Sequence, residues 1–249
     1  MEFFILVLLV CLLIFLASLF LLAGDDLVFL RRDISMERVF DMGLVMAILS
    51  LLGARILYVM LNPSSGFLNP LVFIMFPYFP GLSLTGALVG GLFAFFLFYA
   101  KDAKAPKGRL LDFFSISFLA TLPPGFLGFL LLSLGDKEAK HFHIIGLIVV
   151  FIILLIVILK FSLPALLSGK LKDGTIGVIF LISFSIISLI ENAIDRGGKN
   201  LLSGGIEDVA LLLIFFVSLV FLFRQEKLIS RIKKLNLKTI VKLSKISRT

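Results

Sequence analysis

Arg55, in the apolar stretch 39–62, is the strongest single candidate for chemistry. An ionisable group deep in a membrane-spanning helix costs roughly 2.5–3.5 kcal/mol on insertion scales, so Arg55 is a functional candidate. A guanidinium that faces an interior cavity could grip a phosphate with its planar set of N–H donors. The alternative is that Arg55 extends to the outer membrane interface, because Asn62 and Pro63 end the helix two turns later. Asp41 lies about 21 Å away along the axis and cannot be its partner.

Acidic side chains form a second group of candidates. Glu191, Asn192 and Asp195 stand at the end of the apolar stretch 175–195, and Arg196 follows them. One interpretation is a solvated helix end with pairing between neighbouring charges. The other is that these polar groups have a functional role. Asp112 is expected near the start of its helix, where the helix dipole favours a carboxylate.

Small residues cluster in the stretch 81–100. They are Gly81, Ser83, Thr85, Gly86, Ala87, Gly90 and Gly91. The spacing of Gly86 and Gly90 lets two helices approach closely. Alternatively, the bare backbone could border a lipid headgroup, because glycine permits close approach.

The composition places these residues in a membrane protein. Of the 249 residues, 60% are apolar and 16% are charged, and the mean hydropathy is +1.15. A water-soluble domain has about 45–50% apolar residues, since its own surface must be wetted. Cys11 is the single cysteine and there are two histidines, so we expect neither a disulfide framework nor a metal site. We expect no cofactor.

Seven apolar runs are long enough, at about 20 helical residues, to cross a hydrocarbon core. They cover residues 3–23, 39–62, 81–100, 110–134, 143–168, 175–195 and 206–224. Their length indicates helices rather than the short alternating strands of a barrel. The sequence therefore predicts an all-α integral membrane protein with a seven-span domain over residues 1–224.

Prolines mark two irregular places. Pro123 and Pro124, followed by Gly125, are expected to break or kink the fourth span near its middle. The segment 62–80 is too rich in proline to continue a helix, and we expect it to lie against the membrane face. Residues 1–23 lack a basic start, so we interpret them as a retained helix rather than a cleaved signal peptide.

The distribution of basic residues predicts the orientation. Eighteen Lys and Arg fall in the connections 24–38, 101–109 and 169–174 and in the tail, against four in the alternate connections. Basic residues favour the cytoplasmic side, so the N-terminus faces outside and the C-terminus is cytoplasmic. The tail 225–249 mixes basic and apolar residues, which is typical of an amphipathic helix on an anionic membrane surface. We expect no nucleic-acid partner.

Several motifs in order resemble the prolipoprotein diacylglyceryl transferase family. The residues that carry this resemblance are Asp33–Leu44, Gly53–Val59, Gly81–Ala87, Arg109–Asp112, Gly125–Phe129, Glu191 and Leu202–Gly205. The resemblance covers about residues 1–225 and is also consistent with seven spans and an outer N-terminus. It implies a multi-pass protein of a bacterial-type cytoplasmic (inner) membrane.

The resemblance implies a chemistry as well. In the family, the lipobox Cys thiol of a preprolipoprotein attacks phosphatidylglycerol, the diacylglyceryl group moves to sulfur, and glycerol phosphate leaves. This reaction needs a base and stabilisation of an anionic leaving group. The catalytic candidates are Arg55, Tyr58 and Glu191. The residues that we expect to contact lipid are Arg55, Tyr58, Ser83, Thr85, Gly86, Gly125 and Gly128.

The chain departs from the family pattern at polar positions. Thr85 stands at the position of the family's His, Phe126 and Phe129 replace its signature Arg and Asn, and Ser188 stands for a further Arg. Three hypotheses follow. The chain is a divergent active transferase whose polar groups come from elsewhere, including Arg55, Tyr58, Glu191 and Asp195. Alternatively it is a non-catalytic protein that binds a phospholipid or a lipoprotein signal segment, or an unrelated transporter or scaffold.

Overall fold

A computed structural model describes residues 2–24, 26–63, 81–101, 106–133, 141–195 and 205–225, and these ranges are helical with short connections and no strands. The helices are α1 (Glu2–Gly24), α2 (Leu27–Arg31), α3 (Met36–Leu61), α5 (Leu84–Lys101), α6 (Lys107–Ser133), α7 (His141–Val157), α8 (Leu163–Leu167), α9 (Thr175–Asp195) and α10 (Ile206–Gln225). A π-helical turn, Ile158–Ser162, joins α7 to α8. The prediction of an all-helical membrane protein is thus confirmed.

Six of these helical stretches are long and apolar enough to cross a membrane. They are Phe3–Gly24, Met36–Leu61, Lys107–Ser133, His141–Leu167, Thr175–Ile194 and Ile206–Gln225. The third predicted span corresponds to α5, whose apolar part Leu84–Leu97 is shorter. Each of the seven predicted stretches therefore contains a helix, while the count of seven crossings stays a prediction.

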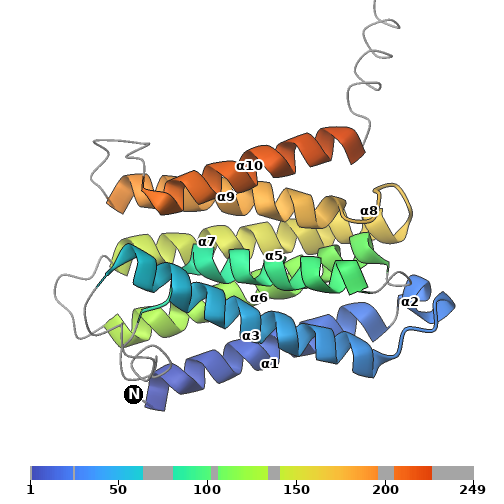
Figure 1. Cartoon of the computed structure of the whole chain (residues 1–249), viewed down its shortest axis with the longest axis horizontal. Coiled ribbons are helices and arrows are strands. Elements are labelled where there is room, and N and C mark those ends of the chain that lie inside the picture. Colours follow the sequence, from blue (N-terminus) through green and yellow to red (C-terminus); the bar gives the residue numbers. More distant parts are fainter. Residues whose placement is uncertain are drawn as a thin grey trace, which may run out of the picture.

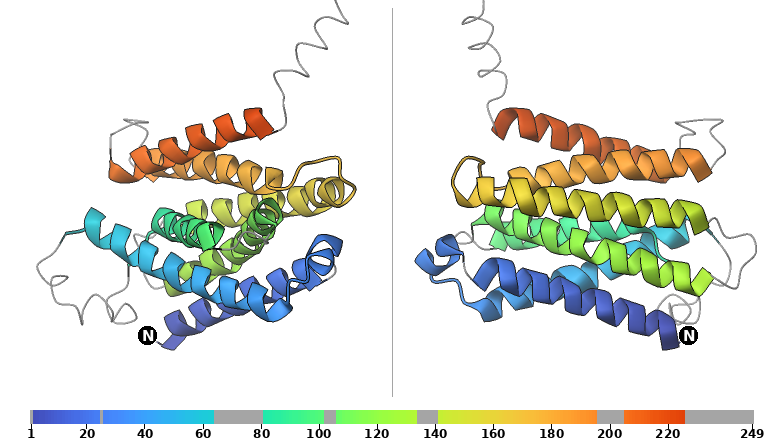
Figure 2. Two further views of the ribbon diagram at one scale, coloured as in Figure 1. Left: turned by 45° about the vertical axis from the view of Figure 1, so that its right-hand side comes forward. Right: turned by 180° about the vertical axis from the view of Figure 1, so that it is seen from behind.

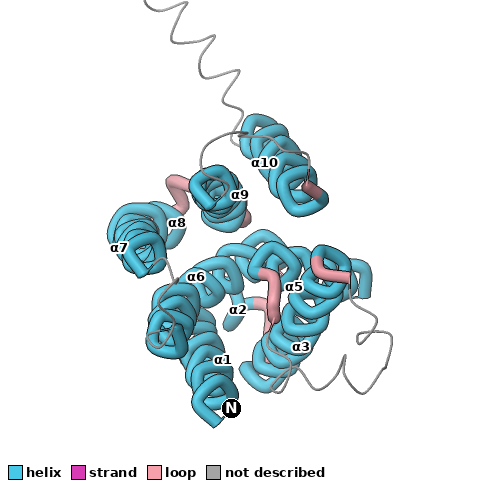
Figure 3. Tube along the Cα trace, turned by 90° about the vertical axis from the view of Figure 1, so that its left-hand side faces the viewer, coloured by secondary structure: helices cyan, strands magenta, loops and turns pink. Residues whose placement is uncertain are grey.

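The long helices lie side by side, and the chain passes from one end of the bundle to the other (Figure 1). The end of α3, the start of α5, the end of α9 and the start of α10 share one end, which we call the site end. Further views show α10 as an outer helix beside α9 (Figure 2). Seen along the bundle, α1 packs against α3 and α6, α3 against α5, and α6 against α7 and α9 (Figure 3).

Helix α6 continues through Pro123 and Pro124, so of the predicted break or kink the break does not occur and the kink stays a prediction. Proline is tolerated in buried membrane helices where nearby hydroxyls and neighbouring helices satisfy the freed backbone groups. The carbonyl oxygens that lose their N–H partner are those of Leu119 and Ala120, and the hydroxyl of Thr121 donates to the neighbouring carbonyl oxygen of Phe118 at 2.7 Å. The prediction for 62–80 falls largely on residues outside the described ranges, and so does the prediction for the tail 225–249.

Glycines set the contact between α3 and α5. A Cβ on Gly53 would lie 2.6 Å from the carbonyl oxygen of Gly86, and one on Gly90 would lie 2.3 Å from that of Leu49. Real Cβ atoms do not approach backbone so closely, so glycine is required for this crossing. This contact, which we call the glycine seam, is formed by Gly53, Gly86 and Gly90. It explains how the start of α5 is held against the second half of α3.

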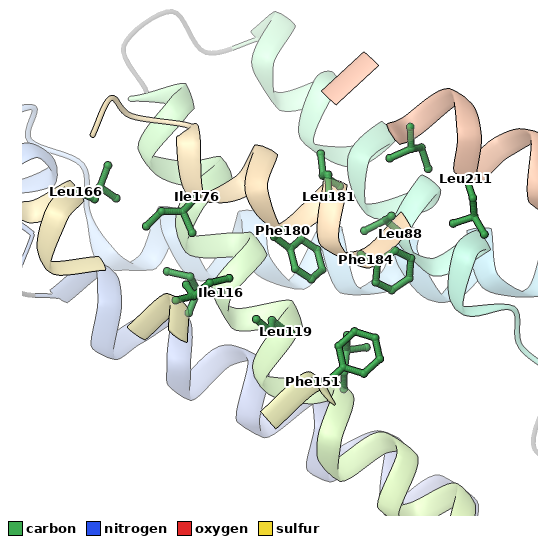
Figure 4. Packing of buried hydrophobic residues seen from close by; sticks show 13 residues of the cluster. Leu88, Ile116, Leu119, Phe151, Leu166, Ile176, Phe180, Leu181, Phe184 and Leu211 are labelled. Carbon is green, nitrogen blue, oxygen red and sulfur yellow. The ribbon is translucent and has the colours of Figure 1, made fainter. Parts of the chain in front are cut away.

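The interior contains two apolar clusters. In the larger one, Phe180 and Phe184 of α9 meet Phe151 of α7 and Leu119 of α6 (Figure 4). The other cluster joins α1, α2, α3 and α6 around residues such as Phe113. Together they fix the helices whose ends carry the polar groups.

A polar network closes the end opposite the site end. Arg109 of α6 donates from Nε to Asp26 Oδ2 at 2.9 Å and from Nη1 to Asp173 Oδ1 at 3.0 Å. Asp112 is fully buried and accepts the backbone N–H groups of Gly174 and Gly177 at 2.6 and 2.8 Å. The carboxylate of Asp112 lies near the start of its own helix, as expected, but the dipole that it contacts belongs to α9.

Candidate functional site

Arg55 lies inside the protein, near the end of α3, with 2% of its surface exposed. Its Nη1 donates a hydrogen bond to the carbonyl oxygen of Gly81 at 2.9 Å. Its Cζ is 5.8 Å from the centroid of the Tyr58 ring. The guanidinium is turned into the bundle, which supports the interior interpretation over extension to the membrane interface. The structure therefore brings together Arg55, predicted from its place in an apolar helix, and Tyr58, predicted from the family resemblance.

Gly81 owes its place beside Arg55 to its lack of a side chain. Its φ angle is +153°, and a Cβ there would lie 2.1 Å from Cε1 and Cζ of the Tyr58 ring. Only glycine combines this backbone conformation with so close an aromatic neighbour. The Tyr58 ring thus lies directly on Gly81, whose carbonyl oxygen is presented to Arg55.

Ser83 joins three helices at the site end. Its backbone N–H donates to the carbonyl oxygen of Ala54 on α3 at 3.0 Å. Its hydroxyl oxygen accepts the N–H of Gly86 at 3.1 Å, which caps the start of α5. The same hydroxyl donates to Oε1 of Glu207 on α10 at 3.2 Å. This junction places a carboxylate beside the segment that holds Arg55.

A second polar contact links α9 to α10. The side-chain amide of Asn192 donates to Oδ1 of Asp208 at 3.0 Å, and Asp208 is only 1% exposed. Glu191, the catalytic candidate from the sequence, is half-buried one residue away. Sequence reasoning did not single out Glu207 or Asp208. The signal that could have found them is a pair of acidic residues in the first turn of an otherwise apolar helix.

The remaining predicted lipid contacts fall into two places. Thr85 is buried at the start of α5, and Gly86 lies in the glycine seam, where a Cβ would be 2.5 Å from the carbonyl oxygen of Gly53. Gly125 and Gly128 instead face α1. A Cβ on Gly125 would lie 3.6 Å from Cys11 Sγ, and one on Gly128 would lie 2.4 Å from Val7 Cγ1. A lipid-binding role for any of these residues stays a prediction.

The positions that depart from the family pattern have apolar or neutral surroundings. Phe126 stacks on Phe151 of α7, with ring centroids 5.7 Å apart, and Phe129 is exposed on the outside of α6. Ser188 is buried on α9. Within the described ranges, no group of three His, Cys, Asp or Glu residues is placed to hold a metal ion.

Taken together, the structure is that of a helical, multi-pass membrane protein with a buried guanidinium and several carboxylates at one end of the bundle. The model of the prolipoprotein diacylglyceryl transferase family matches residues 5–131. This is about half of the chain, and the protein belongs to that family. The comparisons with curated proteins and with solved structures found no match. The matched part contains Arg55 and Ser83, whereas Glu191, Glu207 and Asp208 lie beyond it.

Proposed function

We propose that the chain binds an anionic phospholipid such as phosphatidylglycerol at Arg55 and transfers its diacylglyceryl group to the lipobox cysteine of a preprolipoprotein. The observation that carries this proposal is the burial of Arg55 inside the part of the chain that matches the family. A buried guanidinium in a membrane protein is costly, so it is expected to serve a ligand. A phosphate is the group that its N–H donors fit best.

Arg55 would act on the phosphate throughout the reaction. Its charge would hold the headgroup in the ground state and stabilise the negative charge that grows on the departing glycerol phosphate. One such donor is typically worth about 2.7–4 kcal/mol, or 10²–10³ in rate. The ring of Tyr58, 5.8 Å from the guanidinium carbon, adds a cation–π contact that keeps the guanidinium in place.

The proposed orientation places this reaction on the outer side of a bacterial-type cytoplasmic membrane. Basic residues concentrate in the connections 24–38, 101–109 and 169–174 and in the sequence after α10. The helix ends that adjoin these segments lie opposite the site end, which favours a cytoplasmic position for them. The site end would then face the outer leaflet, and the seven helices would each cross once. Lipoprotein signal segments would approach the site from that side.

A second function is favoured by the surroundings of Phe126 and Thr85. Phe126 packs on Phe151, where it offers no hydrogen bond, and the hydroxyl of Thr85 has no useful basicity. A chain with these residues could bind phospholipid or a lipoprotein signal segment without turning it over. Both proposals place the phospholipid at Arg55, but only the first includes transfer of its diacylglyceryl group.

The test is a transfer assay with the purified full-length protein in phosphatidylglycerol vesicles. A lipobox peptide receives the labelled diacylglyceryl group, and the rate is compared between wild type and Arg55→Ala. We expect a slow but measurable rate that falls at least a hundredfold in the variant. Lys160→Ala is the control, because Lys160 is exposed and lies on the π-helical turn after α7. A flat time course at high protein concentration would eliminate the transferase and leave the binding protein.

A further inference from the structure

The carboxylate of Glu207 is held at the Arg55 site by a single neutral side chain. Glu207 is half-buried in the first turn of α10, and its Oε1 accepts the hydroxyl proton of Ser83 at 3.2 Å. Because the Ser83 oxygen also accepts the N–H of Gly86, the hydroxyl proton is directed toward Glu207. The contact thus fixes one carboxylate oxygen and leaves the other able to accept a second proton donor.

The same short segment ties this carboxylate to the guanidinium. The carbonyl oxygen of Gly81 accepts from Arg55, and two residues later Ser83 bonds both Ala54 and Glu207. Within residues 81–83, the first is therefore hydrogen-bonded to the guanidinium of Arg55 and the last to the carboxylate of Glu207. Residues 81–83 thus connect the proposed phosphate-binding cation to the carboxylate.

Other described groups at the site end are less suited to accept a proton. The hydroxyl of Thr85 lacks basicity. Asp208 is almost fully buried and accepts the amide of Asn192. Glu191 lies on α9, whereas Glu207 is bonded through Ser83 directly to the segment that holds Arg55. Glu207 combines basicity, partial exposure and attachment to the Arg55 segment.

We infer that Glu207 is the proton acceptor for the incoming lipobox thiol, an inference that rests on the proposed transferase function. The Sγ–H proton moves to the free oxygen of Glu207. A sulfur electron pair forms a bond to the glyceryl carbon that bears the phosphate ester. The bond between that carbon and oxygen breaks, and its electron pair leaves on glycerol phosphate. Glu207 then returns the proton to water, so atoms and charge balance.

The experiment separates proton transfer from structural support by changing the nucleophile. Glu207→Gln keeps the size of the side chain and its hydrogen bond from Ser83 but removes its basicity. General-base catalysis is typically worth 10²–10⁴-fold, so we expect transfer to a cysteine peptide to fall about a hundredfold. A peptide with selenocysteine in place of cysteine is already ionised near neutral pH and needs no base. With it, we expect the difference between Glu207→Gln and wild type to shrink below about tenfold.

Two further variants and a binding measurement complete the design. Glu37→Gln changes an exposed carboxylate at the opposite end of α3 and should leave both rates unchanged. Glu207→His restores a base and should transfer faster than Glu207→Gln. Binding of phosphatidylglycerol, measured on the same samples, should be alike in wild type and Glu207→Gln.

Three outcomes would overturn the inference. The first is a wild-type rate in Glu207→Gln with the cysteine peptide. The second is an equal loss with both nucleophiles, which would make Glu207 a structural residue. The third is a wild-type protein that binds phospholipid in an Arg55-dependent way but transfers nothing to either peptide. That result would refute both the role of Glu207 as a base and the proposed transferase function. A failure of lipid binding itself would refute the proposed phosphate site at Arg55.

Discussion

The buried carboxylate of Asp112 offers a sharp test of how the bundle is held together. Asp112 belongs to α6, yet each of its oxygens accepts a backbone N–H from the start of α9, at Gly174 and at Gly177. It therefore caps a helix that begins more than sixty residues later in the chain. Replacement by Asn keeps the shape but turns one acceptor into an N–H donor that faces another donor.

The cost of Asp112→Asn follows from these two contacts. A hydrogen bond to a charged group contributes about 1.5–3 kcal/mol, and an unpaired buried N–H costs about 1–3 kcal/mol. The favourable contact of a carboxylate with a helix N-terminus adds about 0.3–1 kcal/mol. Allowing for partial relaxation, we expect the free energy of unfolding to fall by about 3 kcal/mol, roughly a hundredfold in the equilibrium constant.

The measurement is reversible unfolding of the full-length protein in mixed micelles, followed by the loss of helix signal. Asp41→Asn is the matched control, because Asp41 is an exposed carboxylate on α3. We expect the control to change stability by less than about 0.5 kcal/mol. Equal effects of the two substitutions, or an unchanged stability in Asp112→Asn, would refute the idea that Asp112 joins α6 to α9.

Two other substitutions test the packing in the same assay. Gly86→Ala would place a Cβ 2.5 Å from the carbonyl oxygen of Gly53 and should lower the free energy of unfolding by about 1–3 kcal/mol. The control Gly146→Ala, whose Cβ would have nothing within 4 Å, should be neutral or slightly stabilising. Equal losses of stability in the two variants would contradict the close glycine contact between α3 and α5. The Ser117 hydroxyl is buried and has no partner in the described part of the chain, so Ser117→Ala should leave stability unchanged or raise it by up to about 1 kcal/mol. Ser185→Ala, which removes a bond to the carbonyl oxygen of Leu181 at 2.8 Å, should be destabilising, and a larger loss at Ser117 would contradict this account.

The helices were predictable because apolar length alone marks them. The predicted stretch 175–195 coincides with Thr175–Asp195, and 206–224 differs from Ile206–Gln225 by one residue. The predicted stretch 81–100 begins before the helix α5, because Ser83 caps α5 and the helix itself begins at Leu84. At Pro123 and Pro124 the local pattern left a break and a kink open, and the continuous helix excludes the break.

Only part of the candidate site could be predicted from the sequence. Arg55 stood out because a charged group inside an apolar helix is unusual on its own, and Tyr58 became a candidate only through the family resemblance. The contact between Ser83 and Glu207 joins residues 124 positions apart, and no periodicity predicts it. Asp112 was assigned to the dipole of its own helix for the same reason, because its partner in space is the start of α9.

The proposal that Arg55 binds a lipid phosphate can be tested by the amount of anionic phospholipid that purifies with the protein. Wild type, Arg55→Ala and the control Lys160→Ala are extracted in the same detergent, and bound lipid is quantified by mass spectrometry. We predict that wild type and Lys160→Ala retain phosphatidylglycerol in equal amounts and that Arg55→Ala loses at least nine-tenths of it, in keeping with about 1.5–3 kcal/mol for a charged hydrogen bond. Retention of the wild-type amount by Arg55→Ala would refute the proposal that Arg55 binds the phosphate.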